Sequence, residues 1–412
     1  MPRRRGRARA ALIRAVASLA VLSLAGCSAS PSAAPPEAVP ATPQAELTTT
    51  ALSVSAVKPP VRLAGSDGRT HVEYDLVLQN VFSAPVTVTS IEVLGADGSV
   101  LLALDGPDVA AVSSTLFPGS PSAVVPAGGA LAAVIDLAIA AEQVPERITH
   151  RIRYEPGSSP AAAIIGTREI SGPELTVDSR EPTVISAPLK GTQWLNANAC
   201  CAPGASHRAA RLAVGGNAIK KAEEFAVDWT QARNGRLFDG DGSRNVQWYG
   251  FGADVLAVAD GTVASTFDGL PDQAPDTPAT GLRGPRDYTG NHVSQQIAPG
   301  VWAIYGHLQP GSITVRTGDQ VKKGQVIGKL GSSGNARNPH LHFQLSDGPE
   351  ITTSNSLPFA LGSYWLAGTV DPGRLAGAFG DNGAPEPLKV TGPGRQELGT
   401  YPLAYTVANL GY

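Results

Sequence analysis

The chain has 412 residues, with 32 basic and 35 acidic side chains and a formal net charge of −3. It carries no basic patch of the kind that nucleic-acid-binding proteins use, so we expect no nucleic-acid partner. Only 7 histidines and 3 cysteines occur in the whole chain, which makes any close grouping of these residues informative.

The N-terminal residues predict export. Five arginines between positions 3 and 9 precede an apolar run from Ala15 to Ala25, which is too short to span a bilayer as a permanent helix. The run ends in Leu24-Ala-Gly-Cys27, which resembles the bacterial lipobox, where the cysteine is lipidated; the alternative is an ordinary signal peptide that contains Cys27. We therefore predict a lipoprotein signal peptide at residues 1–26. Acyl chains on Cys27 would hold the exported protein at the outer face of the cytoplasmic membrane or in the cell envelope.

Residues 27–50 are rich in Pro, Ala, Ser and Thr and cannot bury enough apolar surface to fold, so we predict a tether. Residues 51–180 are predicted to be all-β. Apolar and polar residues alternate in 71–80 and 86–94, and turn sequences separate such runs, which indicates an Ig-like antiparallel β-sandwich. We expect this domain to be a spacer or a binding module. His71 and His150 are isolated histidines, and neither has a predicted role.

Residues 181–412 are Gly-rich and still mostly β in pattern. Strand, turn and strand follow one another in 255–264 and again in 313–330, and a helix is plausible only around Ala218 to Glu224. The segment from Asp268 to Tyr288 contains four prolines and little apolar patterning, which predicts a long loop at a functional rim.

The stretch Asn338-Pro-His-Leu-His-Phe-Gln344 carries the clearest chemical signal. Residues i and i+2 of a strand share one face, so His340 and His342 point the same way, while Leu341 and Phe343 form an apolar face. Two parallel imidazoles are typical of a metal or proton-transfer site, because isolated buried histidines each need a separate partner.

Two further motifs precede this stretch: Phe225-Ala-Val-Asp228-Trp229 and Tyr305-Gly-His307-Leu308. Asp, His and His-X-His in this order resemble the lysostaphin-type (β-lytic, LytM-like) zinc metallopeptidases, over roughly Ala226 to Leu345. The resemblance implies a β-sheet domain of the duplicated-hybrid-motif type, one Zn²⁺ ion, and hydrolysis of peptide bonds in peptidoglycan stem or cross-link peptides. It does not extend to the N-terminal sandwich, and it leaves protein partners and oligomeric state open.

The family resemblance also implies residue roles. Asp228 and His342 correspond to zinc ligands, and His307 and His340 to the histidines that move protons and stabilise the tetrahedral intermediate. These roles agree with the chemistry, since Zn²⁺ takes about four N or O donors and a free imidazole titrates near neutral pH.

The third ligand departs from the family pattern, in which a histidine lies four residues before the aspartate. Glu224 occupies that position here. If the chain stayed extended, Glu224 would lie about 13 Å from Asp228 and could not reach the same ion. We prefer His207, which lies 21 residues before Asp228 in a loop after Cys200 and Cys201, and keep Glu224 as the second choice.

The adjacent cysteines are predicted to form a disulfide, with free thiols and zinc ligands as alternatives.

Three functions remain open from the sequence. The first is an active zinc endopeptidase of the cell wall. The second is a degenerate member that binds peptidoglycan or regulates another hydrolase, which the replacement at Glu224 favours. The third is a biotinyl- or lipoyl-like carrier, suggested by the hairpin at 318–328, but this reading leaves His340 and His342 unexplained.

Overall fold

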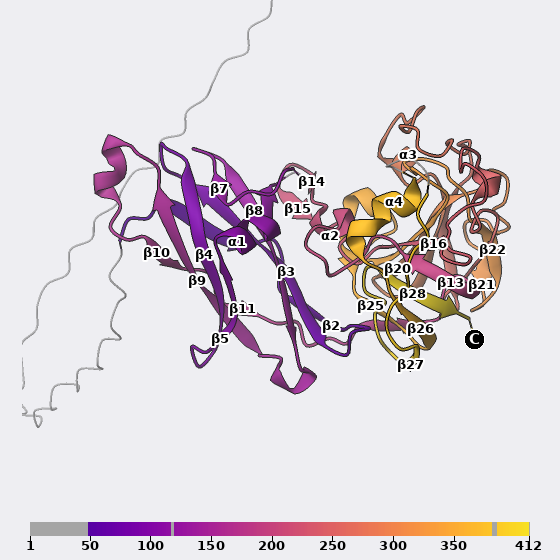
Figure 1. Ribbon diagram of the computed structural model, residues 1–412, viewed down its shortest axis with the longest axis horizontal. Helices are drawn as coiled ribbons and strands as arrows, with labels where there is room; N and C mark the ends of the chain where they lie inside the picture. The colour runs from indigo at the N-terminus through magenta and orange to yellow at the C-terminus, as the bar shows by residue number, and fades with distance from the viewer. Residues whose placement is uncertain (1–47, 117–118, 381–384, 412) are drawn as a thin grey trace, which may run out of the picture. The chain divides into compact units, whose positions relative to one another are not determined.

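The computed structural model describes residues 48–116, 119–380 and 385–411 (Figure 1). The predicted signal peptide, Cys27 and nearly all of the tether lie outside these residues. From Thr48 onward the chain forms one compact unit. No helix in the described part of the chain is long and apolar enough to cross a membrane.

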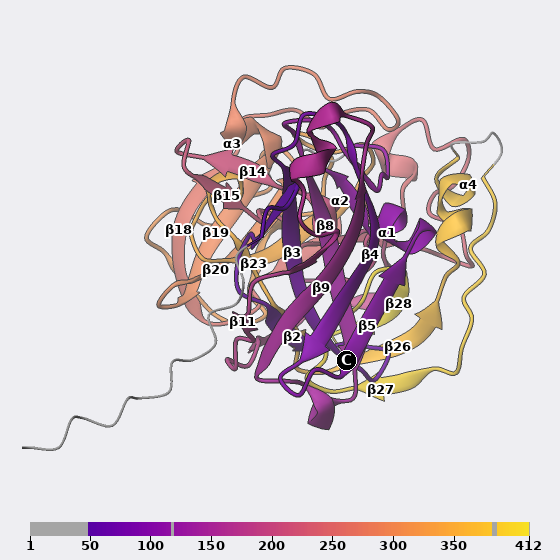
Figure 2. The same cartoon turned by 90° about the vertical axis from the view of Figure 1, so that its left-hand side faces the viewer.

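Two antiparallel sheets form the N-terminal sandwich (Figure 2). The first has the order β1-β3-β8-β6 with β2 also on β3: β1 (Leu52–Ala56), β2 (Val61–Ala64), β3 (Thr70–Asn80), β6 (Ser113–Thr115) and β8 (Ala130–Ile139). The second has the order β10-β9-β4-β5, with β7 on β4 and β11 on β9: β4 (Val86–Gly95), β5 (Val100–Asp105), β7 (Val124–Val125), β9 (Arg147–Pro156), β10 (Glu169–Ser171) and β11 (Leu175–Thr176).

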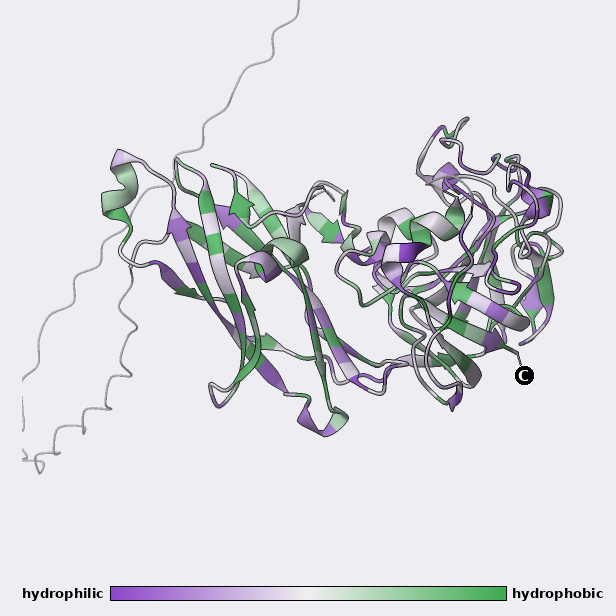
Figure 3. Ribbon diagram, in the orientation of Figure 1, coloured by the Kyte–Doolittle hydropathy of each residue, from purple (hydrophilic) through white to green (hydrophobic). Residues whose placement is uncertain are grey.

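Alternation along these strands builds the sandwich core. Val72, Tyr74 and Leu76 of β3 pack with Ile91 of β4 and Ile152 of β9, all of them buried. The strands change between green and purple along their length in Figure 3, as a pattern with one apolar face requires. The predicted all-β class is confirmed, while the likeness to an Ig domain stays a prediction.

An 11-stranded sheet dominates the C-terminal part, in the order β21-β18-β19-β20-β23-β16-β13-β28-β26-β27 with β24 on β23. Its strands are β13 (Gly191–Asn196), β16 (Val227–Gln231), β18 (Gly261–Phe267), β19 (Asn291–Ala298), β20 (Val301–Leu308), β21 (Gln320–Val321), β23 (Leu341–Ser346), β24 (Ser356–Leu357), β26 (Tyr364–Thr369), β27 (Arg395–Glu397) and β28 (Thr406–Leu410).

Three strand pairs and three short helices complete the described part of this domain, and a fourth helix lies in the sandwich. The pairs are β12 (Thr183–Ile185) with β25 (Phe359–Leu361), β14 (Leu212–Val214) with β15 (Ala218–Lys220), and β17 (Asp254–Leu256) with β22 (Val326–Lys329). The described helices are α1 (Pro107–Val112, in the sandwich), α2 (Ser206–Ala209), α3 (Pro285–Tyr288) and α4 (Leu375–Phe379). Single 3₁₀ segments occupy Ala141–Gln143, Pro160–Ile164, Asn245–Gln247, Ile351–Thr353 and Pro372–Arg374.

The predicted helix around Ala218 to Glu224 is wrong. Residues 218–220 are strand β15, and residues 222–225 form a turn. Gly215 and Gly216 have φ of 64° and 74°, a region that suits glycine, and they turn the chain from β14 back into β15. Hairpin pairing therefore overrides the local helical tendency of the Ala- and Lys-containing segment.

Strand register aligns the predicted motifs. In the antiparallel pair of β16 and β23, Asp228 lies directly opposite His342, and His342 in turn lies opposite Gly306 of β20. Opposite residues share a face, so Asp228 and His342 point to the same side. Val227 and Phe343 form another opposite pair, and both are buried in the core on the other face.

Candidate metal centre

Four histidines and one carboxylate meet on the polar face of the central strands. His342 Nδ1 lies 3.2 Å from Asp228 Oδ1, and His340 Nε2 lies 3.4 Å from the same oxygen. His207 Nε2 of α2 lies 3.3 Å from the other oxygen, Oδ2. The ring of His307 lies 4.7 Å from the ring of His340, centre to centre. The structure thus brings together Asp228, His307, His340, His342 and His207.

In three of these rings, a hydrogen bond to a backbone carbonyl determines which nitrogen is left free. Nδ1 faces a carbonyl oxygen in each case: Ala226 for His207 (3.3 Å), Asn338 for His340 (2.7 Å) and Ser333 for His307 (2.8 Å). A carbonyl oxygen only accepts, so Nδ1 must donate its hydrogen. In a neutral ring the lone pair then lies on Nε2.

A side-chain amide fixes the fourth ring in the opposite sense. His342 Nε2 lies 2.9 Å from Gln344 Oε1, while Gln344 Nε2 donates to the carbonyl oxygen of Ala222 and to Ser346 Oγ. The amide oxygen therefore faces the ring and accepts from Nε2. This leaves Nδ1 of His342 as the nitrogen that faces Asp228, and partners of this kind are typical of metal-ligating histidines.

The donor set fits a cation. In their neutral forms the rings aim lone pairs at the carboxylate of Asp228, which only accepts, and Asp228 Oδ1 is buried without a hydrogen bond among the described residues. Nitrogen and oxygen donors of this type suit Zn²⁺. His207, Asp228 and His342 could hold it, which is the set that the family resemblance and the preference for His207 predict.

In the metal-free protein, burial and the neighbouring charges shift the pKa values of these same groups. Burial lowers the pKa of His342, but the carboxylate of Asp228 outweighs it and raises that pKa to about 9. Burial raises the pKa of Asp228, but the opposite effect of His207 and His340 is larger and brings that pKa well below its usual range. Burial lowers the pKa of His307 and of His340, which keeps both rings neutral at pH 7.

His307 has an unusual backbone conformation. Its φ is 59°, in the left-handed region, which costs a residue with a side chain about 1–3 kcal/mol. Hydrogen bonds at both sides hold it there: its N–H donates to Thr289 O (3.0 Å), and its carbonyl accepts from the N–H of Gly331 (3.0 Å). Strain of this kind is concentrated at functional sites, and here the His307 ring lies beside the rings of His340 and His342.

Glu224 points away from this centre. Its buried carboxylate pairs with Lys58 and lies 3.4 Å from Nη1 of Arg208. The neighbouring Glu223 faces the centre instead, and one of its oxygens lies within 4.8 Å of ring nitrogens of both His207 and His342. The turn at 222–225 sends the two adjacent glutamates in opposite directions. The sequence did not indicate Glu223, because the turn at 222–225, which points it toward the centre and Glu224 away from it, was not predicted.

His207 and His342 therefore have two carboxylates in reach, Asp228 and Glu223. We favour Asp228 as the ligand because its oxygens lie 3.2 and 3.3 Å from the ring nitrogens of His342 and His207.

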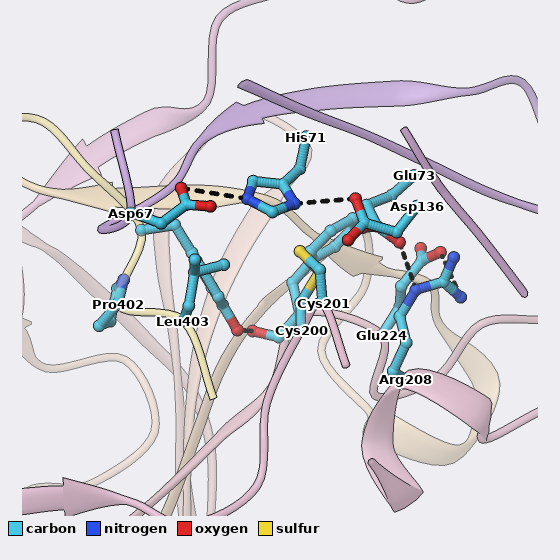
Figure 4. Close-up of a disulfide and its surroundings, with 12 residues drawn as sticks. Asp67, His71, Glu73, Asp136, Cys200, Cys201, Arg208, Glu224, Pro402 and Leu403 are labelled. Carbon is cyan, nitrogen blue, oxygen red and sulfur yellow. Dashed lines mark hydrogen bonds and ion pairs between the residues drawn. A yellow bond between two sulfur atoms is a disulfide. The ribbon is translucent and has the colours of Figure 1, made fainter. Parts of the chain in front are cut away.

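Cys200 and Cys201 form a disulfide with each other in the structure, across a cis peptide bond. Both are buried, and the carbonyl oxygen of Cys200 accepts from the N–H of Ala404 (2.9 Å). Cys201 also lies near His71 and Glu73, but a disulfide sulfur has no thiolate to offer a metal (Figure 4).

A cavity of about 920 Å³ opens beside the histidines. Its walls include Leu212 and Val214 of β14, Tyr288 of α3, and Leu282 and Ile351. Leu282 and Tyr288 belong to the long segment 268–288, so this loop does form part of the rim, as the sequence predicted. A mainly apolar cavity with a few polar groups is typical of a ligand-binding site.

Comparisons with known proteins point to one family. Residues 248–353 match peptidase family M23, a stretch that includes His307, His340 and His342. The chain is 36% identical over 95 residues to Endolysin 2638A of Staphylococcus phage 2638A, covering 22% of this chain and 16% of the relative. It is 30% identical over 127 residues to the cell division protein DipM of Caulobacter vibrioides, covering 31% of this chain and 17% of that one.

The matched region thus spans about a sixth of each relative's length. Among solved structures, the catalytic domain of lysostaphin from Staphylococcus simulans is similar at 20% identity and a TM-score of 0.21, over 40% of this chain and 86% of that one. The family match over 248–353, rather than this low score, carries the assignment. The C-terminal part of this chain therefore contains a domain of peptidase family M23.

Proposed function

We propose that this protein is a zinc-dependent endopeptidase that hydrolyses peptide bonds in the stem or cross-link peptides of peptidoglycan. The observation that carries the proposal is that His207 Nε2 and His342 Nδ1 lie 3.3 and 3.2 Å from the two carboxylate oxygens of Asp228. A Zn²⁺ ion held there supplies a Lewis acid and lowers the pKa of a water molecule.

His307 and His340 favour an enzyme over a binding protein. A site that only held a metal or a ligand would need neither ring, yet both stand beside the centre with Nδ1 bonded to a carbonyl and Nε2 free to act. Because Nδ1 of each ring donates to a carbonyl oxygen, Nε2 is the atom that would accept a proton from the attacking water and return it to the leaving amine.

The second candidate is a non-catalytic member that regulates another cell-wall hydrolase. Its main support was the replacement of the usual first histidine by Glu224. His207, which lies 3.3 Å from Asp228, offers an imidazole in its place and so removes most of that support. The similarity to a protein named for cell division keeps the regulatory reading as the alternative outcome of the test.

The test is incubation of the purified full chain with peptidoglycan, followed by mass spectrometry of the released fragments. We expect new amino termini at peptide bonds, and their loss when a chelator removes the metal. Glu155→Gln changes an exposed side chain of β9, in the sandwich, and serves as a control that should cleave like the wild type. Stable binding of peptidoglycan without any new amino terminus would favour the regulatory alternative.

We also propose that the protein is exported and held in the cell envelope by lipid on Cys27. The arginine-rich start, the short apolar run and Leu24-Ala-Gly-Cys27 support this. Cys27→Ser should move the protein from the membrane fraction to the soluble fraction, because acyl chains are the proposed anchor. An unchanged distribution between the two fractions would count against lipidation.

A further inference from the structure

We propose that the N-terminal sandwich supports the metal centre: Asp75 and Glu73 of β3 are positioning residues that hold α2, and with it His207, through a buried ion-pair network. The inference rests on the proposed zinc site and goes beyond it, because it gives the sandwich a direct part in forming that site.

The helix that carries His207 cannot hold its own orientation. α2 has four residues, a single turn, and turns of this length are not stable by themselves. His207 and Arg208 are consecutive, so their side chains leave the backbone about 100° apart. His207 faces Asp228, and Arg208 faces the sandwich. Fixing Arg208 therefore fixes the direction of the His207 ring.

Each of the three nitrogens of the Arg208 guanidinium group has a partner that holds it in place. It is fully buried; Nε bonds to Glu73, and Nη1 lies 2.6 Å from Asp75 Oδ1. Nη2 donates to the backbone carbonyls of Tyr74 (3.0 Å) and Ile135 (3.3 Å). A planar fork held at all three nitrogens has one orientation, which a lysine could not reproduce. Figure 4 shows Arg208, Glu73 and Glu224 close together beside the disulfide.

Asp75 holds more than Arg208. Its second oxygen lies 2.6 Å from Arg211 Nε and 2.8 Å from Lys221 Nζ, and Lys221 also donates to the backbone carbonyl of Arg208 (2.6 Å). One carboxylate thus ties both ends of the segment 208–221, which includes the β14–β15 hairpin and its part of the cavity wall. Burial raises the pKa of Asp75, but the opposite effect of Lys221 and Arg208 is larger. The pKa is therefore lowered, and the carboxylate stays charged.

The use of charged side chains between α2 and the sandwich indicates that their role is to orient α2. Burying these ions costs desolvation energy, and apolar side chains would pack the two surfaces together at no such cost. What ion pairs add is a defined geometry for each partner. Glu224 takes part in the same network through Arg208, which explains why the position four residues before Asp228 no longer faces the metal centre.

The test uses Asp75→Asn in the full chain, which removes the charge and keeps the shape. Glu92→Gln is the matched control, since Glu92 pairs with Arg151 (2.6 Å) in the other sheet of the sandwich. Zinc affinity is measured by competition with a chromogenic chelator, and ligand geometry by the absorption spectrum of the Co²⁺-substituted protein. We expect Asp75→Asn to weaken zinc binding at least about tenfold and to change the spectrum, and Glu92→Gln to change affinity by less than about twofold.

A folded Asp75→Asn protein with wild-type affinity and spectrum would overturn the proposal. If this variant does not fold, Arg208→Lys replaces it, with the same expectation and the same contrary result. Hydrogen exchange of the metal-free protein separates this inference from the zinc site itself. If the wild type binds no metal, the proposed function fails, and the exchange of amides 206–211 decides: faster exchange in the variant than in the control supports the positioning of α2, and equal exchange overturns it.

Discussion

Replacing His307 or His340 by alanine is expected to lower hydrolysis at least about a hundredfold, the range for loss of a general acid or base, while zinc stays bound. His307 Nδ1 donates to Ser333 O and His340 Nδ1 to Asn338 O, which leaves each Nε2 available to exchange a proton. Neither ring belongs to the three-residue donor set, so removing one should not release the metal. The measurement is the rate of release of new amino termini, together with zinc content.

His292→Ala is the matched control for these two variants. This histidine is also buried and also bonds through Nδ1 to a carbonyl, that of Gly290 (2.7 Å), but it lies on β19 beside Phe267 and is outside the proposed centre. Its hydrolysis rate should stay close to that of wild type. If His307→Ala or His340→Ala loses zinc in step with activity, that histidine is a ligand and its assigned role is wrong.

The second large effect is expected for His207→Ala, which should lose zinc almost completely. A three-ligand site that loses one imidazole keeps too few donors to retain the ion through dialysis, and occupancy should fall below about a tenth of an equivalent. His342 supplies one imidazole donor just as His207 does, so His342→Ala should lose zinc in the same way.

Glu224→Gln is the informative comparison, because it changes the residue that occupies the family's usual ligand position. Glu224 pairs with Lys58 and Arg208 and not with the centre, so the amide should lower zinc occupancy far less than His207→Ala does. Glu223→Gln separates the two carboxylates near the ring nitrogens, and zinc retention there would support Asp228 as the ligand. Zinc retained by His207→Ala but lost by Glu224→Gln would reverse the proposed assignment.

The sequence predicted the parts of the site that follow from strand periodicity. His340 and His342 are two residues apart at and just before β23, and Asp228 lies between Val227 and Trp229, which lie on the core face of β16. Such patterns fix the face on which a side chain lies. The preference for His207 over Glu224 assumed an extended chain, but residues 222–225 form a turn, and Glu224 lies away from the centre because it pairs with Lys58 and Arg208.

The ion network could not be predicted, for a physical reason. His71, Glu73 and Asp75 alternate with apolar residues on β3, and a solvated polar face has the same pattern. Arg208 and Lys221, the partners of Glu73 and Asp75, lie more than 130 positions along the chain, so the pairing exists only after both sheets have folded. Glu223 was missed for a related reason, since its direction depends on a turn within the segment that we expected to be helical.

The zinc content of the purified full chain after mild dialysis tests the central claim most directly. With His207 Nε2 and His342 Nδ1 at 3.3 and 3.2 Å from the oxygens of Asp228, the centre should retain about one zinc per chain. A wild-type content below about a tenth of an equivalent, in protein that is folded and was purified without chelator, would contradict the account.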